Sequence, residues 1–433
     1  YLFADVKNFL LYDFFATEGY VNENVFAYSN RSGDERALVV FNNKFERARG
    51  WIKTSVAYKV KTESGEHLEQ KSLAEGLGLR NDDRYFTIFR DQINGLEFIR
   101  SNRQLWNDGL YVELEAFKYQ VFLDFREVED NEWHHYAQLN DYLNGRGVPN
   151  IEETVKELYL QPVHLQFEKL IHQESLRQFR RLRTASVYSA TDYLMQSFDG
   201  FISVAAKFVA AENKTSKIIE GFKKNLFRVS NLPDSISGFM TIKKYQTAFK
   251  KLFMEIQNKE IQWERKLFFF LALRDIGKLI AENDHAELSR SYIDEWLLGK
   301  LMRHSLTESK IAENEIERII LLTEILVLFQ DWHENLEEEK PIYHLLKNLL
   351  AYSEIQNFLG VNRYEDILWY NKENFESLIR WLTLVALFEM PSKKTTANKK
   401  AKKIFYIAEN LQSISKKSGY QIEKLIELSK ELK

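Results

Sequence analysis

The pattern of apolar and polar residues changes near residue 150. Before that point, apolar residues stand in short runs or alternate with polar residues, as they do in β-strands. Beyond it, apolar residues recur every three or four positions, the spacing of amphipathic helices. Ten of the 17 glycines precede residue 150, so turns are expected mainly in the same part. The pattern predicts an α+β multi-domain fold, with an N-terminal antiparallel, sandwich-like β-domain followed by a large all-α helical region.

The clearest strand signals predict a hairpin. Residues 25–29 and 37–41 are runs of β-branched and aromatic residues, and residues 31–34 between them have the composition of a turn. Further strands are predicted at residues 51–60, 84–90 and 95–99, and one or two more within residues 111–128. Residues 1–15 have mixed periodicity and indicate no particular element.

The helical part begins with a capping signal. Asn150 and Glu153 have the spacing of a capping box, and comparable apolar stripes follow at residues 201–209, 267–280, 311–329, 375–388 and 422–432. The longest apolar candidate, residues 319–329, is shorter than the roughly 18 to 20 residues of a membrane helix, and it includes Glu324. This stretch predicts a buried helix, so we expect no membrane partner and favour a cytoplasmic location.

Charge and cysteine content exclude several classes of function. The 60 Lys and Arg residues nearly balance 63 Asp and Glu residues, and the net charge of −3 gives no reason to expect nucleic acid as a partner. The chain has no cysteine, which rules out disulfides, a thiol nucleophile and Cys-ligated metals. No glycine-rich phosphate loop and no G-x-S-x-G motif is present. We therefore expect no cofactor.

Two basic groups have alternative interpretations. A group of arginines around Phe179 either holds a phosphate-bearing partner or forms a solvated helix face paired with carboxylates, and the second is favoured; its members are Arg177, Arg180, Arg181 and Arg183. Residues 393–403 contain six lysines with small polar neighbours and no periodicity. They predict an exposed linker.

Histidines do not have the spacing of a metal site. His134 and His135 are adjacent and so point in different directions, while Asp331, His333 and Glu334 lie in a charge-rich stretch. Structural roles are favoured for all of them, and no metal is expected.

Four aromatic residues of the β part, or at its edge, could stack on sugar rings. They are Trp51, Trp106, Trp133 and Tyr136. Each is a candidate for a glycan contact or for an inter-domain contact. Filling of a core, or packing against a neighbouring domain, is the favoured interpretation.

The most distinctive text lies in residues 8–52. It includes Val-Phe-Ala-Tyr at 25–28 and Leu-Val-Val-Phe-Asn at 38–42, separated by a short charged turn. This resembles the stretch that follows the catalytic barrel in the α-amylase family of glycoside hydrolases (family 13), where the chain enters a C-terminal antiparallel β-domain. Residues 360–364 and 368–373 look like the helical extension of a large bacterial subgroup of that family.

The resemblance implies chemistry that can be compared with the residues. Members of the family cleave α-glucosidic bonds by a retaining mechanism with two carboxylates, and the nucleophile sits in a Gly-x-Arg-x-Asp motif. Residues 78–82 match this motif letter by letter, but Asn81 stands where an apolar residue is expected, and the match follows the β-domain text instead of preceding it. We interpret it as a loop. The family's His-Asp pair does not occur in the chain, so we assign no catalytic residue here and expect these residues upstream of Tyr1.

The resemblance also divides the chain. Residues 1–20 would be a barrel-exit segment, residues 21–130 the β-domain and residues 131–390 the helical domain, followed by a Lys-rich linker at 391–404 and terminal helices at 405–433. The expected function is that of a non-catalytic C-terminal part of an enzyme acting on starch, glycogen or maltodextrin. Its partners would be the upstream barrel of the same polypeptide and the α-glucan, and its helices would supply scaffold or oligomer contacts. The alternative is a stand-alone interaction protein or a glycan-binding module without catalytic activity.

Overall fold

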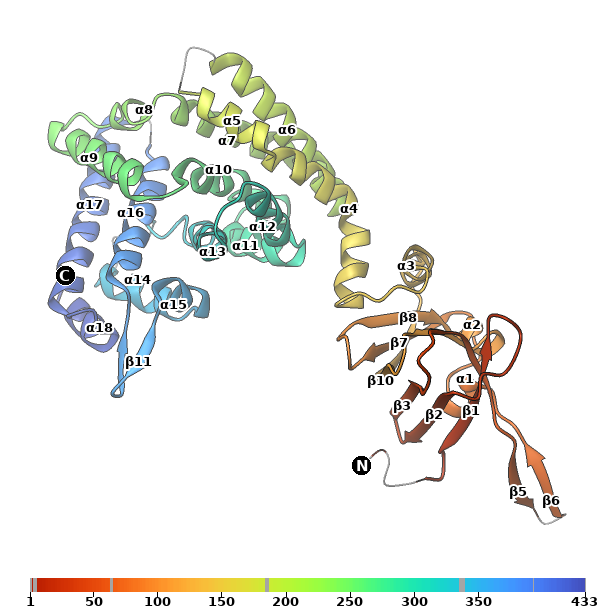
Figure 1. The fold of residues 1–433 in the computed structure, drawn as a ribbon. Helices are drawn as coiled ribbons and strands as arrows, with labels where there is room; N and C mark the ends of the chain where they lie inside the picture. Colours follow the sequence, from red (N-terminus) through yellow and green to blue (C-terminus); the bar gives the residue numbers. More distant parts are fainter. Residues whose placement is uncertain are drawn as a thin grey trace. The chain divides into compact units, whose positions relative to one another are not determined.

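The computed structural model describes residues 2, 6–62, 65–183, 187–334, 339–391 and 393–432. The chain forms two compact units, Tyr1–Leu160 and Gln161–Lys433, which we call the β unit and the helical unit. The predicted fold class is confirmed, because an antiparallel β region precedes a large helical region (Figure 1).

The described residues of the β unit form ten strands and four helical segments. Its elements are β1 (Leu10–Ala16), β2 (Val25–Ser32), β3 (Glu35–Asn42), β4 (Ala48–Ser55), β5 (Tyr58–Thr62), β6 (Gly65–Glu69), α1 (Leu73–Leu77), β7 (Tyr85–Asp91), β8 (Glu97–Ser101), α2 (Asn102–Asn107), β9 (Leu110–Leu114), β10 (Tyr119–Glu129), α3 (His135–Leu143) and the beginning of α4 (Ile151–Ile171).

Eight strands form one sheet in the order β8-β7-β10-β3-β2-β1-β4-β9, and neighbouring strands are antiparallel. The predicted hairpin is β2–β3, with register from Val25↔Asn42 to Ser32↔Glu35. That register leaves Gly33 and Asp34 as the turn, and Gly33 has φ of 60°, a conformation that glycine adopts without a Cβ clash.

One expected strand of the β part needs correction, and the structure defines two other segments. The strand predicted at 51–60 is two strands, because β4 ends at Ser55 and β5 pairs with β6 in a separate two-stranded sheet. Residues 111–128 also contain two strands, β9 and β10, and Phe117 with φ of 55° lies in the turn between them. The expected barrel-exit segment, residues 1–20, contributes β1, which pairs with both β2 and β4. Residues 1 and 3–5 lie outside the described residues.

The boundary between the units also differs from the predicted one at residues 130/131. It falls within α4, because α3 and the first turns of α4 pack on β7 and β8. Leu139, Leu143 and Ile151 share one buried cluster with Ile88 and Ile99. The carboxylate of Glu97 accepts a hydrogen bond from the backbone N–H of Ile151 at 2.8 Å, and Asn150 Oδ1 accepts from the N–H of Glu153 at 2.9 Å, as the capping signal predicted.

The sheet curls around a second, larger core. Phe89 lies at its centre, with ring centroids 5.2 Å from both Phe122 and Phe125 and 5.8 Å from Phe98. The other buried members come from every strand of the sheet except β8 and from α1 and α2, and include Leu10, Phe14, Val40, Ile52, Leu77, Leu105 and Val112.

The helical unit contains the end of α4 and the elements that follow it. They are α5 (Gln173–Arg181), α6 (Val187–Phe208), η1 (Glu212–Lys214), α7 (Thr215–Ser230), α8 (Asp234–Ser237), α9 (Lys243–Lys259), α10 (Trp263–Leu273), η2 (Ile276–Leu279), α11 (His285–Glu295), α12 (Leu298–Glu308), α13 (Glu313–Leu328), α14 (Pro341–Leu350), α15 (Ser353–Leu359), β11 (Asn362–Tyr364), β12 (Ile367–Trp369), α16 (Lys372–Phe388), α17 (Lys394–Lys417) and α18 (Ile422–Lys430).

The predicted apolar stripes correspond to α6, α10 with η2, α13, α16 and α18. Residues 319–329 are buried as expected, and Glu324 is buried with them. Among the described residues, no helix is long and apolar enough to cross a membrane. The short hairpin β11–β12 was not predicted; its turn is Glu365–Asp366, and both residues have positive φ.

The predicted lysine-rich linker is wrong, because α17 begins at Lys394 and continues without interruption to Lys417. The helix packs on α16 and α9 (Figure 1). Ala397, Ala401 and Ile404 are fully buried at the contacting face, at the helical spacing i, i+4, i+7. The lysines between them occupy the other faces, so the apolar stripe is difficult to recognise in the sequence.

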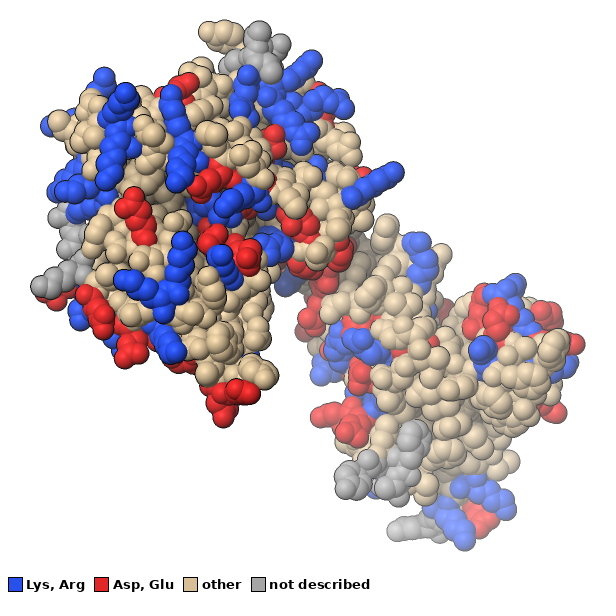
Figure 2. Space-filling view, turned by 60° about the vertical axis from the view of Figure 1, so that its left-hand side comes forward, with Lys and Arg blue, Asp and Glu red and all other residues tan. Residues whose placement is uncertain are grey.

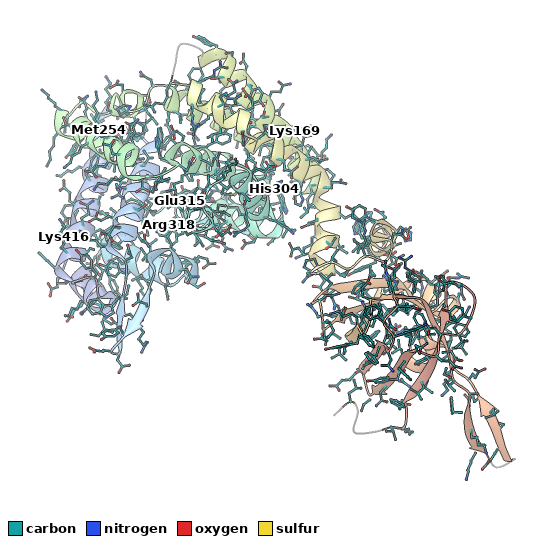
Figure 3. The ribbon with its side chains drawn as sticks, in the orientation of Figure 1. Lys169, Met254, His304, Glu315, Arg318 and Lys416 are labelled. Atoms are coloured by element: carbon teal, nitrogen blue, oxygen red, sulfur yellow. The ribbon has the colours of Figure 1, made fainter. Side chains whose placement is uncertain are left out.

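Buried charges connect several helices of the unit. Glu260, which follows α9, accepts hydrogen bonds from Arg380 at 2.7 and 3.1 Å and from the hydroxyl of Ser377 at 2.9 Å. Lys266 of α10 lies 3.6 Å from Glu260 and 3.2 Å from Glu315 of α13, which is labelled in Figure 3. Since each buried charge has an opposite neighbour, removal of one partner would leave an uncompensated charge.

The assignment of α17 as a continuous helix predicts how it responds to proline. We expect Ala401→Pro to lower the free energy of unfolding by about 3 kcal/mol or more, because it removes an internal hydrogen bond and clashes with the preceding turn. Lys394→Pro is the control, since Lys394 is the first helical residue and Lys393 before it is extended, with ψ of 113°. Urea denaturation measures both variants. Equal, small effects would indicate a linker and contradict the helix.

Glu324 predicts a pH dependence of stability. Burial raises the pKa of this carboxyl to about 7, and Asp294, Glu354 and Glu317 contribute to the rise against the opposing effect of Arg290. The folded state therefore holds a proton that the unfolded chain releases above its ordinary pKa of 4.5, so this group's contribution to stability falls as the pH rises from 4.5 to about 7.

We therefore expect Glu324→Gln to change stability little near pH 4 and to raise the free energy of unfolding by roughly 3 kcal/mol at about pH 8. Urea denaturation at both pH values measures the difference. The exposed Glu427→Gln on α18 is the control for the loss of one carboxyl group. An equal effect of Glu324→Gln at both pH values would show that folding does not raise the pKa of the Glu324 carboxyl.

Candidate functional site

The β unit has a groove of about 920 Å³ between the two edge strands of its sheet. Phe98 and Arg100 of β8 line one side, and residues Leu110 to Glu113 of β9 line the other. We call it the seam groove, because the curled sheet brings its first and last strands to opposite sides of it. Its size is in the range of small-molecule sites.

The base of the seam groove is aromatic. Phe89, Phe98 and Phe122 all line it, and the rings of Phe98 and Phe122 meet edge to face at 6.0 Å. These rings belong to the buried core of the unit or pack against it. The base is therefore held rigidly by the packing of the sheet.

Trp51 and Tyr111 form one wall. They are direct cross-strand neighbours on β4 and β9, their ring centroids are 5.1 Å apart, and each is 37% exposed. The hydroxyl of Tyr111 donates to Glu113 at 2.8 Å. This hydrogen bond is the main cause of a raised pKa of Tyr111 and a lowered pKa of Glu113. The carboxylate thus stays ionised at the rim of the groove.

Polar side chains face this wall. They come from α2, the end of α3 and the loop after it, namely Gln104, Asn140, Asp141, Asn144 and Arg146. Gln120 of β10 also lines the groove, and its Oε1 is buried with no hydrogen-bond partner among the described residues.

Arg100 fixes the loop after α3. It donates to the carbonyls of Ile99 at 2.8 Å and Gly145 at 3.0 Å, and burial lowers its pKa to about 10. The guanidinium remains charged near neutral pH. The loop that follows Asn144 is thereby held against β8, which fixes the polar side of the seam groove.

The structure places only Trp51 of the four candidate aromatic residues in this groove. Trp106 packs against the large core and donates to the carbonyl of Arg80 at 3.1 Å. Trp133 is 66% exposed and stacks on His135, while Tyr136 packs in the α3–α4 cluster. These three residues do not line the groove.

The motif-like Asp82 and the histidines contact neighbouring protein groups or are buried. Asp82 of the motif-like stretch lies in a loop, as predicted, and the hydrogen bond from Arg84 lowers its pKa to about 2. His134 lies 3.3 Å from Asp130, and burial lowers the pKa of His333 to about 3. No cluster of three His, Asp or Glu side chains suited to a metal ion occurs among the described residues.

Two arginines of the cluster around Phe179 are paired with carboxylates, as predicted. Arg177 forms an ion pair with Glu174, and Arg180 lies 3.9 Å from Glu264. Arg183 instead lies over the ring of Trp263, 5.3 Å from its centroid.

A second candidate surface is the outer face of the sheet. Its side chains alternate with buried core residues along the strands, and many are apolar: Leu11, Phe15, Phe26, Tyr28, Val39, Phe41, Trp51, Tyr111, Tyr119 and Val121. Register places Phe26, Phe41 and Tyr119 in one row across β2, β3 and β10. We call this surface the outer sheet face. The β unit, the smaller body in Figure 2, shows broad areas without charged side chains.

Comparison of the chain with family models, with curated proteins and with solved structures gives no match.

Proposed function

We propose that this chain is a non-catalytic accessory region of an α-amylase-family glycoside hydrolase acting on α-glucans. In this proposal the β unit packs its outer sheet face against the catalytic barrel of the same polypeptide. The observation that carries the proposal is the apolar character of that face, where Phe26 and Tyr119 remain about half exposed, at 48% and 50%.

An antiparallel sheet with one solvated face normally alternates apolar and polar residues. β1, β2, β3 and β10 instead carry apolar side chains on both faces. Two-sided apolar strands are typical of sheets that are covered on both sides, and large exposed apolar patches mark interaction sites. The outer sheet face therefore supports a partner of the size of a globular domain.

The segment that resembles the family supplies the centre of this face. Leu11 and Phe15 lie on β1, and Phe26, Tyr28 and Phe41 lie on β2 and β3. In the proposal, the residues that carry the resemblance are those that contact the barrel. No residue of this chain takes a catalytic role.

A second candidate function is favoured by the seam groove. Planar aromatic side chains beside amide, carboxylate and guanidinium groups suit a sugar, whose apolar ring face stacks while its hydroxyls form hydrogen bonds. Trp51 and Tyr111 supply the aromatic wall, and Gln104, Asp141 and Asn144 supply polar groups across from it. Binding of an α-glucan here would serve the same enzyme, or it would make the β unit a glycan-binding module on its own.

Reading the coding DNA on the 5′ side of the Tyr1 codon tests the accessory role. A frame that continues into several hundred residues with Gly-x-Arg-x-Asp, a strand-end Glu and His-Asp is the expected result. A start codon immediately before Tyr1 would overturn the proposal, and an interaction or glycan-binding protein would replace it.

The outer sheet face predicts self-association of the chain in isolation. We expect light scattering to show oligomers whose size increases with concentration, because apolar surface is removed from water when copies associate. The double variant Phe26→Thr/Tyr119→Thr should shift the distribution toward the monomer, since threonine keeps the strand preference and removes apolar area. Ile261→Thr, an exposed site in the helical unit, is the control and should change nothing. A monomeric wild-type chain at high concentration would contradict the docking role.

The seam groove predicts retention on an amylose column that depends on Trp51. We expect Trp51→Ala to weaken binding of a maltooligosaccharide roughly tenfold, which corresponds to about 1.4 kcal/mol for the lost stacking contact. Trp133→Ala, which removes an exposed tryptophan outside the groove, should bind as the wild type does. Retention that survives Trp51→Ala, or that is lost with Trp133→Ala, would exclude the groove as the glycan site.

A further inference from the structure

The helical unit has a groove of its own between α9 and α17, of about 490 Å³. Lys244 and Tyr245 of α9 line one side, and Lys399, Lys402, Lys403 and Phe405 of α17 line the other. We call it the lysine groove. Figure 3 shows α9, where Met254 is labelled, and α17, where Lys416 is labelled, on the same side of the unit.

The described lining of the lysine groove is mostly basic. Four ammonium groups line it, and Glu409 is the only carboxylate among the lining residues that the structure describes. Lys244 and Lys402 are exposed, and neither has an ion-pair partner within 4.0 Å in the part of the chain that the structure describes. Figure 2, in which α9 and α17 come forward, shows basic side chains over this side of the helical unit.

The fold of α17 does not require the lysines of the groove. Lys399, Lys402 and Lys403 stand at i, i+3 and i+4, so they lie on one helix face. Ala397, Ala401 and Ile404 hold the opposite face against the unit.

Aromatic side chains adjoin the charges. The rings of Tyr245 and Phe405 are stacked, with an interplanar angle of 11° and centroids 6.3 Å apart, and this pair joins α9 to α17. Tyr406 adds a further ring that is 46% exposed. The groove thus has aromatic side chains beside a concentration of positive charge.

We propose that the lysine groove binds a small phosphate monoester that carries a ring, such as a sugar phosphate or a nucleoside monophosphate. Lysine ammonium groups bind phosphate as point charges, and the ring packs against the aromatic side chains of Tyr245 and Phe405. The volume fits one such molecule. The site lies in the helical unit and does not depend on the proposed accessory role of the β unit.

Isothermal titration of the whole chain at low salt tests the site with two probes, glucose 6-phosphate and AMP. We expect at least one to bind, and which one binds distinguishes a sugar phosphate from a nucleotide. Glucose and adenosine, which lack the phosphate, should not bind. Raising the salt concentration should weaken binding, because exposed charges are screened.

Matched charge reversals locate the site. Lys244→Glu/Lys402→Glu should weaken binding roughly tenfold or more, because two of the four ammonium groups become carboxylates. Lys416→Glu/Lys417→Glu makes the same change of net charge at the other end of α17, outside the groove, and should bind as the wild type does. Thermal unfolding of both variants confirms that they remain folded.

Four results would overturn the proposal. Absence of binding of both phosphate probes at millimolar concentration would exclude the ligand class. Equal loss of binding in both double variants would show attraction by net charge alone. If inorganic phosphate binds as tightly as the esters, and the affinity is unchanged in Phe405→Ala, the ring contact is excluded. Preference for single-stranded DNA or polyglutamate over both esters would indicate a polymer site.

Discussion

The central strands of the β unit are apolar on both faces, and the rest of that unit follows from this constraint. A sheet with two apolar faces must cover both. Curling encloses the inner face around Phe89 and leaves the outer face without a cover among the described residues. Curling without closure also leaves β8 and β9 as edges, and the gap between them is the seam groove. Both candidate surfaces of the β unit thus arise from one packing problem.

In the helical unit the main constraint is different, because several buried helices carry charged side chains that need partners. Glu260, Lys266 and Arg380 are each less than a tenth exposed, and each contributes to one connected network. Such a network stabilises less than an apolar core of the same volume, but it fixes the positions of α10, α13 and α16. A shifted helix would leave a buried charge without its opposite partner. Helices α9 and α17 of the same unit pack against each other and form the walls of the lysine groove.

The elements that local sequence determines were predicted, and those that depend on distant contacts were not. The β2–β3 hairpin follows from two apolar runs around Gly33, and α13 from its strong stripe. The linker at 391–404 was wrong because, within that stretch, only Ala397, Ala401 and Ile404 belong to the buried stripe of α17, and two of these are small residues surrounded by lysines. The seam groove had no linear signal, since Trp51, Arg100 and Asn144 come from three separate elements that only the sheet brings together.

The aromatic residues illustrate why composition alone does not locate a binding surface. Trp51 and Trp106 were both candidates for a sugar contact, but Trp106 donates its indole N–H to a carbonyl and packs its ring against the core. Trp51 stands on the outward side of β4, at the edge pair with Tyr111, where neither core nor backbone uses its face. On α17, likewise, the buried alanines pack the helix against the unit, and the lysines on another face line the groove. The residues that stabilise each element therefore differ from those that line its groove. Substitution of Trp51 or Lys402 should change binding with little effect on the fold.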